Sequence, residues 1–190
     1  MTRGRGDPAF FINRSMHWTD LEQITPPTSP VLTVEDVKTH LAIAHSDEDD
    51  YLATLIDVAA AYIDGPNGVG IALKPQTWKL WADDWRPRQR LQIPLGPVRQ
   101  IVEVIADGVV VDPDHYIVRG DRLRILNPRT IRDLTVEFTA GYETVPADLL
   151  HAIRLIVGHL YANREATTET ALSTVPYAVD AILNRYRVAA

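Results

Sequence analysis

The period at which apolar side chains recur changes twice along this chain of 190 residues, and the changes constrain its fold. Before residue 75 the spacing is helical, as in the stripe Leu52, Leu55, Ile56, Ala59 and Ile63. From Thr77 to residue 140 apolar and polar side chains alternate, as in half-buried strands. Helical spacing returns after Pro146. The sequence therefore predicts an α+β fold, with four main helices and an antiparallel β-sheet inserted between the second and third.

Residues suited to helix starts locate the first two predicted helices. Thr33 can cap the first helix, and Glu35 and Asp36 follow in its first turn, where carboxylates interact favourably with the helix dipole. Ser46 is the predicted cap of the second helix. The first turn of that helix is then filled by Asp47, Glu48, Asp49 and Asp50. Both helices are expected to present a polar face to solvent.

Turn signals divide the alternating region into five or six predicted strands. Asp107-Gly108 and Gly120-Asp121 are dipeptides typical of tight hairpin turns. Strands that follow one another through such short links pair antiparallel. Hydrophobic residues make up 46% of the chain and cysteines are absent. The fold is therefore expected to rest on a buried core without disulfides.

Residues 1–30 show no sustained helical or strand period, and we predict an extended N-terminal arm there. The arm carries more apolar surface than a solvated tail needs, at Phe10, Phe11 and Trp18. Two interpretations remain open. The arm either lies as a strap on its own domain or orders against a neighbouring protein, and in the second case these three residues are its candidate contacts.

Residues 31–190 are predicted to form one domain in three parts. Residues 31–74 are helical, residues 75–142 form the β insertion, and residues 143–190 are helical with a C-terminal tail. The charge of the chain lies in the first part, where two basic and eight acidic side chains give a net charge of −6. Such a segment is either a pair of solvated helix faces or a surface that must repel polyanions.

The motifs of common catalytic and metal sites are missing from the sequence. It contains no cysteine, no G-x-S-x-G elbow and no H-E-x-x-H pair. His40 and His45 stand five residues apart, which does not fit a helical zinc site. We therefore expect no enzyme activity, no cofactor and no metal. No apolar run reaches the ~18 residues of a membrane span, so no membrane contact is expected.

A loop with three arginines offers one basic surface. Arg86, Arg88 and Arg90 alternate with other residues close to Trp81 and Trp85. Such a loop is either solvated or contacts a nucleic acid or an acidic neighbour. The chain as a whole carries a formal charge of −6, which is not typical of a basic nucleic-acid-binding protein.

The order of several short motifs resembles that of the head–tail connector (adaptor) proteins of tailed phages and phage-derived gene transfer agents. The resemblance covers residues 31–188 and is closest to the branch with a β insertion. The motifs begin with LTVEDVKTHL at residues 32–41 and continue with IPLGPV, FTAGY, VPADL, YANRE and the closing LNRYR. Each motif is weak by itself, and their order carries the resemblance.

The resemblance implies a structural role in the neck of a virion or gene transfer agent particle, assembled in the bacterial cytoplasm. Such proteins form a ring, usually of twelve copies, beneath the portal protein. The ring extends the DNA channel and offers a docking surface to the stopper and the tail, and DNA passes through it without specific binding. By this resemblance, portal binding falls on the C-terminal helix and tail: Ile182, Leu183, Arg185, Tyr186, Arg187, Val188, Ala189 and Ala190.

The same resemblance gives the acidic segment a role. Asp47, Glu48, Asp49 and Asp50 are candidate channel-facing residues, because a channel wall should not hold the phosphates. Two alternatives remain: a small nucleic-acid-binding protein, or another neck component such as a stopper or tail-completion protein. Four helices beside a sheet argue against the second, because such components tend to be small β-barrels.

Overall fold

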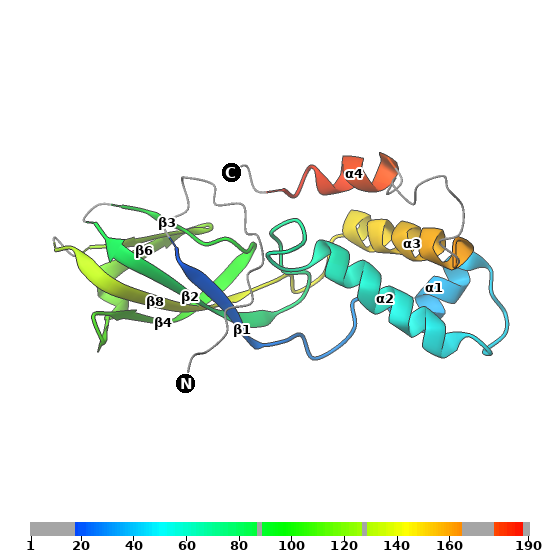
Figure 1. Cartoon of the computed structure of the whole chain (residues 1–190), viewed down its shortest axis with the longest axis horizontal. Coiled ribbons are helices and arrows are strands. Elements are labelled where there is room, and N and C mark those ends of the chain that lie inside the picture. Colours follow the sequence, from blue (N-terminus) through cyan, green and yellow to red (C-terminus); the bar gives the residue numbers. More distant parts are fainter. Residues whose placement is uncertain (1–17, 87–88, 127–128, 165–176, 188–190) are drawn as a thin grey trace, which may run out of the picture.

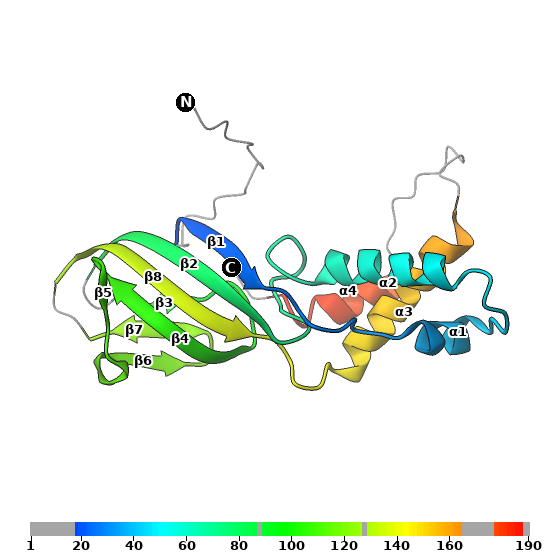
Figure 2. The same ribbon diagram turned by 90° about the horizontal axis from the view of Figure 1, so that it is seen from below.

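The structure is a computed structural model that describes residues 18–86, 89–126, 129–164 and 177–187. It is elongated, with helices at one end and strands at the other (Figures 1 and 2). The helical end, here the helical unit, contains α1 (Val34–Leu41), α2 (Asp49–Ile63), α3 (Ala147–Ala162) and α4 (Tyr177–Leu183). The α+β class and the four helices of the sequence prediction are therefore present.

Two antiparallel sheets form the other end, here the β unit. One sheet has the strand order β1-β2-β8-β4-β5 and the other the order β3-β7-β6. The strands are β1 (Asp20–Thr25), β2 (Gln76–Trp85), β3 (Leu91–Gln92), β4 (Val98–Ala106), β5 (Val109–Val110), β6 (Tyr116–Arg119), β7 (Arg122–Ile125) and β8 (Ile131–Ala140). The predicted turns at residues 107–108 and 120–121 join β4 to β5 and β6 to β7.

Each unit has its own hydrophobic cluster. The helical cluster includes Leu52 of α2 and Ile153 of α3, both fully buried. In the β unit, Phe138 of the larger sheet and Leu123 of the smaller sheet belong to one cluster, so the two sheets pack face to face. Between residues 76 and 140 the described chain forms seven strands rather than five or six. The extra strands are short, and strands of two residues leave no alternation to read.

The start of α1 agrees with the sequence prediction. The side chain of Thr33 accepts a hydrogen bond from the backbone nitrogen of Asp36 at 3.1 Å. The Asp36 carboxylate in turn accepts from the backbone nitrogen of Thr33 at 3.0 Å, which completes a capping box. The Thr33 hydroxyl also donates to Oδ2 of Asp36 at 2.6 Å. This hydrogen bond, followed by that from the Thr33 backbone nitrogen, lowers the pKa of Asp36.

The prediction for the start of α2 was wrong. The helix begins at Asp49, its N-cap residue is Glu48, and no side chain caps it. Ser46 contributes only its backbone oxygen, which accepts from the nitrogen of Asp49 at 3.3 Å. Asp47 and Glu48 therefore lie before the first turn of α2. The carboxylate of Glu48 pairs with Arg164, far along the chain, which a local sequence pattern does not show.

Strand β1 was not expected from the sequence. It pairs antiparallel with β2, with Leu21 opposite Leu80, and forms an edge of the larger sheet. The sheet is thus built from residues 20–25 together with the insertion between α2 and α3. Most side chains of β1 are exposed, because they project from the edge strand. An exposed edge strand needs no alternation of polar and apolar residues, so its sequence carries no strand signal.

Gly141 lies where β8 leaves the β unit toward α3. Its φ angle is 124°, and a Cβ atom there would approach the carbonyl oxygen of Lys74 to 2.1 Å. Only glycine allows this close approach of the two connecting segments. The position therefore helps to set how the helical unit follows the β unit.

Candidate docking surfaces

The C-terminal helix packs on α3 through the residues that portal binding was predicted to use. Leu183 is 0% exposed and belongs to the helical core, and Ile182 and Tyr186 pack against it half-buried. Leu183 therefore anchors α4 in the fold. Of the other candidates, Arg185 and Arg187 are exposed. Val188, Ala189 and Ala190 lie outside the described residues.

Asp148 at the start of α3 holds the segment after α4. The Tyr186 hydroxyl donates a hydrogen bond to its Oδ1 at 2.6 Å, and Nη1 of Arg185 lies 3.2 Å from its Oδ2. The hydrogen bond from Tyr186 lowers the pKa of Asp148. Burial, followed by the hydrogen bond to Asp148, raises the pKa of Tyr186 to about 12. The two contacts attach the segment after α4 to the start of α3, one through the neutral Tyr186 hydroxyl and one through the charged Arg185 guanidinium.

The four acidic residues before and in α2 have different environments. Nζ of Lys38 lies 3.0 Å from Oδ1 of Asp49. Glu48 is held by Tyr161 of α3 and by Arg164 after it. Asp47 and Asp50 are exposed. Glu48 and Asp49 therefore form ion pairs within the fold, while Asp47 and Asp50 point to solvent.

Glu48 joins a cluster that connects the start of α2 to the end of α3. Its carboxylate accepts a hydrogen bond from the Tyr161 hydroxyl and lies 2.6 Å from Nη2 of Arg164. The guanidinium of Arg164 also lies over the rings of Tyr51 and Tyr161, at 4.8 and 4.5 Å from their centroids. The hydrogen bonds from Tyr161 and Arg164 lower the pKa of Glu48.

The described part of the predicted arm first lies on the β unit, through residues 18–25, and then passes beside α2 at Pro27 and Pro30. Trp18 is half-buried and packs against the β cluster, so at this residue the strap interpretation is the one observed. Phe10 and Phe11 lie outside the described residues. Their role as contacts of a neighbouring protein stays a prediction.

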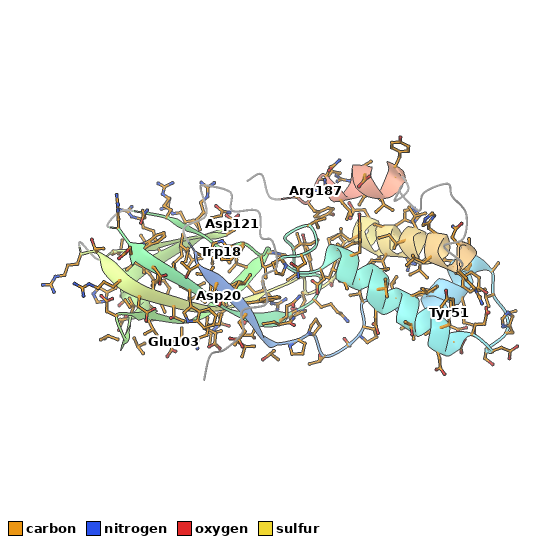
Figure 3. All side chains as sticks on the ribbon, viewed as in Figure 1. Trp18, Asp20, Tyr51, Glu103, Asp121 and Arg187 are labelled. Carbon is orange, nitrogen blue, oxygen red and sulfur yellow. The ribbon has the colours of Figure 1, made fainter. Side chains whose placement is uncertain are left out.

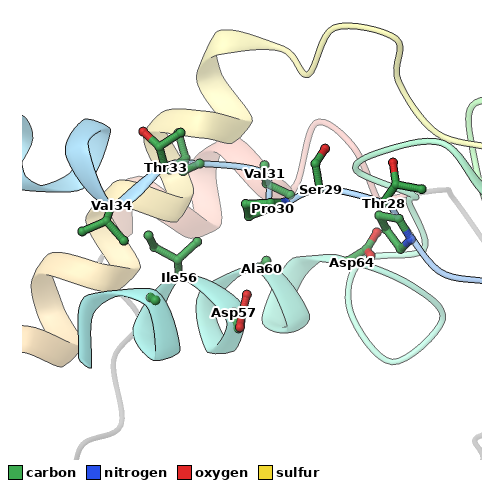
Figure 4. A pocket seen from close by; sticks show the side chains of 13 residues that line it. Thr28, Ser29, Pro30, Val31, Thr33, Val34, Ile56, Asp57, Ala60 and Asp64 are labelled. Carbon is green, nitrogen blue, oxygen red and sulfur yellow. The ribbon is translucent and has the colours of Figure 1, made fainter. Parts of the chain in front are cut away.

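A groove runs between α2 and the chain that leads from β1 to α1 (Figure 4). Its volume is about 710 Å³. Apolar residues such as Val31, Ile56 and Ala60 line it, and Asp57 adds a carboxylate. The groove thus combines apolar walls with negative charge.

The smaller sheet carries a group of arginines that the sequence analysis did not single out. Its members surround a hollow of about 160 Å³ together with Ile117: Arg90, Arg119, Arg122 and Arg124, here the arginine patch. The predicted basic loop at residues 86–90 contributes only Arg90 to it; Arg86 is exposed and Arg88 lies outside the described residues. The signal was present in the alternation of arginine with buried Leu123 and Ile125.

The described residues offer no metal centre. No group of three or more histidine or acidic side chains within them is placed to hold an ion. His40 and His151 instead meet edge to face, with ring centroids 6.1 Å apart. No helix in the described ranges is long and apolar enough to cross a bilayer.

The fold is shared with chains of gene transfer agent (GTA) particles. A chain in the neck of an empty GTA particle, computed with C6 symmetry, has a TM-score of 0.72 at 23% identity. A chain in the virion of a native GTA particle has a TM-score of 0.70 at 22% sequence identity. A chain in the neck of a native GTA particle, computed with C12 symmetry, has a TM-score of 0.64 at 19% sequence identity. Each match covers 90% of this chain and 97% of the other. No curated protein sequence matches.

The family follows from the sequence itself. The head completion protein family (HCP) matches residues 30–189. The chain therefore belongs to the head completion protein family. This membership and the shared fold confirm the resemblance to the connector-type proteins of phages and gene transfer agents.

Proposed function

We propose that this protein is a structural head–tail connector that forms a ring under the portal and extends the DNA channel toward the stopper and tail. The observation that carries the proposal is the head completion family match over residues 30–189. The shared fold with chains of GTA necks over nearly their whole length supports it. The protein acts through contacts alone, catalyses no reaction, and resides in the neck of a phage or gene transfer agent particle.

Portal binding is assigned to the exposed side of the C-terminal segment. Arg185 and Arg187 present charge there, while Leu183 holds α4 to the core from the other side. Arginine is enriched at protein interfaces, because its planar guanidinium group can donate several hydrogen bonds at once.

Asp47 and Asp50 are proposed to face the DNA channel. A negatively charged channel wall lets DNA slide, because it neutralises no phosphates and therefore does not bind the DNA backbone. The double variant Asp47→Lys with Asp50→Lys should slow DNA delivery by particles that contain the normal amount of this protein. Unchanged delivery by such particles would remove these residues from the channel wall.

Twelve copies are proposed for the ring, a number supported by the similar neck structure that is computed with C12 symmetry. The free protein is proposed to be monomeric and to assemble on the portal, which supplies the ordering free energy. DNA passes without specific binding.

The deciding experiment is to image particles made without this protein. We expect filled heads and finished tails that fail to join, and joining should return when the full chain is supplied. Normally joined particles in its absence would refute the connector role. Turnover of a substrate by the purified chain would refute the purely structural one.

A further inference from the structure

The arginine patch is a surface whose charges the fold does not neutralise. Arg119 of β6 lies directly opposite Arg122 of β7. Like charges at directly opposed strand positions destabilise a sheet. Arg124 stands on the same outer face, opposite Ile117. The sheet therefore carries an electrostatic cost that an external negative group would relieve.

Neighbouring acidic groups in the described part of the chain form no ion pair with these arginines. Within the described residues, none of the four arginines lies within 4 Å of a carboxylate. Asp121, in the turn between β6 and β7, instead accepts a hydrogen bond from the side chain of Gln92. Arg122 donates to Oε1 of Gln92 at 3.1 Å, a neutral partner. Ile117 is exposed among these charges, so the patch has an apolar centre.

A complementary surface lies on the helical unit. The outer face of α2 exposes Val58 at 51% and Tyr62 at 45%, one helical turn apart. Asp57 lies beside them and lines the groove along α2. This face, here the α2 outer face, belongs to the segment of net charge −6. It offers an apolar surface with the carboxylate of Asp57 at its side.

The two surfaces belong to different units of the chain. Asp121, next to Arg122, lies in the β unit, and Tyr51 lies on α2 in the helical unit (Figure 3). Within the described residues, no ion pair joins the arginine patch to Asp57. Two different complementary surfaces on a single chain are what a heterologous interface needs, and such interfaces generate rings when the rotation closes.

We propose that the arginine patch of one copy docks on the α2 outer face of the next copy in the ring. Arg124 and Arg122 then approach Asp57, while Ile117 packs on Val58 and Tyr62. The inference rests on the proposed ring-forming connector and adds the surfaces that hold neighbouring copies together. A second copy fits better than DNA, because the centre of each surface is apolar and a phosphate backbone offers nothing to cover it.

A pair of engineered cysteines tests the contact directly. The chain has no cysteine, so every disulfide in the variant Ile117→Cys with Val58→Cys is engineered. After mild oxidation of assembled particles we expect a ladder of covalently linked oligomers. Each single-cysteine variant is the control and should stay monomeric under the same conditions. The proposal fails if particles with the normal amount of the double variant give no ladder, or if a single variant crosslinks equally well.

A charge swap gives a second measurement that does not depend on disulfide geometry. Arg124→Glu and Asp57→Arg should each lower the fraction of assembled rings on portals about tenfold or more, since like charges across an interface cost several kcal/mol. The chain with both changes should regain most of the loss, because each interface then pairs the opposite charges. Arg132→Glu, at an exposed position of β8, is the matched control and should assemble normally.

The outcomes separate this inference from the connector role. Rings that assemble equally in all the charge variants, while heads still need the protein to join tails, refute only the proposed interface. Heads and tails that join without the protein refute the connector role itself. If Arg124→Glu leaves the rings intact but weakens the salt-dependent affinity for DNA, the patch faces DNA and the proposal is overturned.

Discussion

The hydroxyl of Tyr186 donates a hydrogen bond of 2.6 Å to the carboxylate of Asp148, 38 residues earlier in the chain. Tyr186 follows α4 and Asp148 lies in the first turn of α3, so the contact holds the end of the chain to the start of the preceding helix. Both residues lie at the surface proposed to meet the portal. The contact therefore determines how that surface is presented before assembly.

Tyr186→Phe should lower the free energy of unfolding by about 1 kcal/mol, because it removes one hydrogen bond to a charged group that water partly replaces. Urea denaturation measures this loss. Hydrogen exchange should rise in residues 177–187 and stay unchanged in the β unit. Unchanged exchange in α4 would show that the hydroxyl does not hold the segment.

The same pair should make stability depend on pH at both ends of the range. The pKa of Asp148 is lowered from 3.8, so its contribution is present above that value and is lost as the pH falls through the lower folded pKa. The pKa of Tyr186 is raised from 10.0 to about 12, so its contribution is present below pH 10 and is lost between pH 10 and 12. Urea titrations at a series of pH values measure the free energy of unfolding. Asp148→Asn should reduce the loss of this free energy at acid pH, and Tyr186→Phe should reduce its loss at alkaline pH. An alkaline loss equal to that of the wild type in Tyr186→Phe would contradict the assignment.

Leu183→Ala should destabilise the protein by roughly 2–5 kcal/mol, because the side chain is 0% exposed and its removal leaves a cavity between α4 and α3. Tyr177→Ala, on the same helix at 87% exposure, is the control and should change stability by no more than about 0.5 kcal/mol. Thermal melting of the two variants checks the difference. Equal melting temperatures would show that α4 is not part of the cooperative fold.

Reversing the acidic residues near α2 should have two different effects on folding. Glu48→Lys with Asp49→Lys should lower the melting temperature clearly, because it places cations beside Arg164 and Lys38. Asp47→Lys with Asp50→Lys breaks neither pair and should lower the melting temperature much less, through the loss of the first-turn carboxylate of Asp50. If both double variants melt alike, the two ion pairs contribute nothing to stability.

Gly141→Ala should destabilise the protein by on the order of 3 kcal/mol, because a Cβ atom there would lie 2.1 Å from the carbonyl oxygen of Lys74. Gly96→Ala is the matched control, since a Cβ atom at that position meets no atom within 4 Å. Urea denaturation compares the two. A stable Gly141→Ala protein with unchanged small-angle scattering would show that the junction adapts without cost.

The sequence was informative wherever a signal is local. The stripe from Leu52 to Ile63 predicted α2, Thr33 with Asp36 predicted the start of α1, and Gly120-Asp121 predicted a hairpin. Each of these depends on residues a few positions apart. The motif order from residue 32 onward also indicated the family, which the head completion match confirms.

Local signals failed where a distant partner decided the outcome. Ser46 was predicted to cap α2. The N-cap residue is instead Glu48, whose side chain is paired with Arg164, beyond the end of α3. Strand β1 forms because its backbone pairs with the edge of β2, while most of its side chains are exposed and give no strand pattern. Neither partner is near in the chain, so neither is visible in a short window of sequence.

What the sequence determined by itself is the class of fold, the periods of its elements and the family, because these follow from the spacing of side chains along one chain. Only the tertiary structure decided that Arg119 lies opposite Arg122, that Asp148 binds Tyr186, and that Asp47 and Asp50 stay exposed while their neighbours pair. The physical reason is distance. Charges and hydrogen bonds act over a few ångströms in space, and folding brings residues that are far apart in sequence within that range.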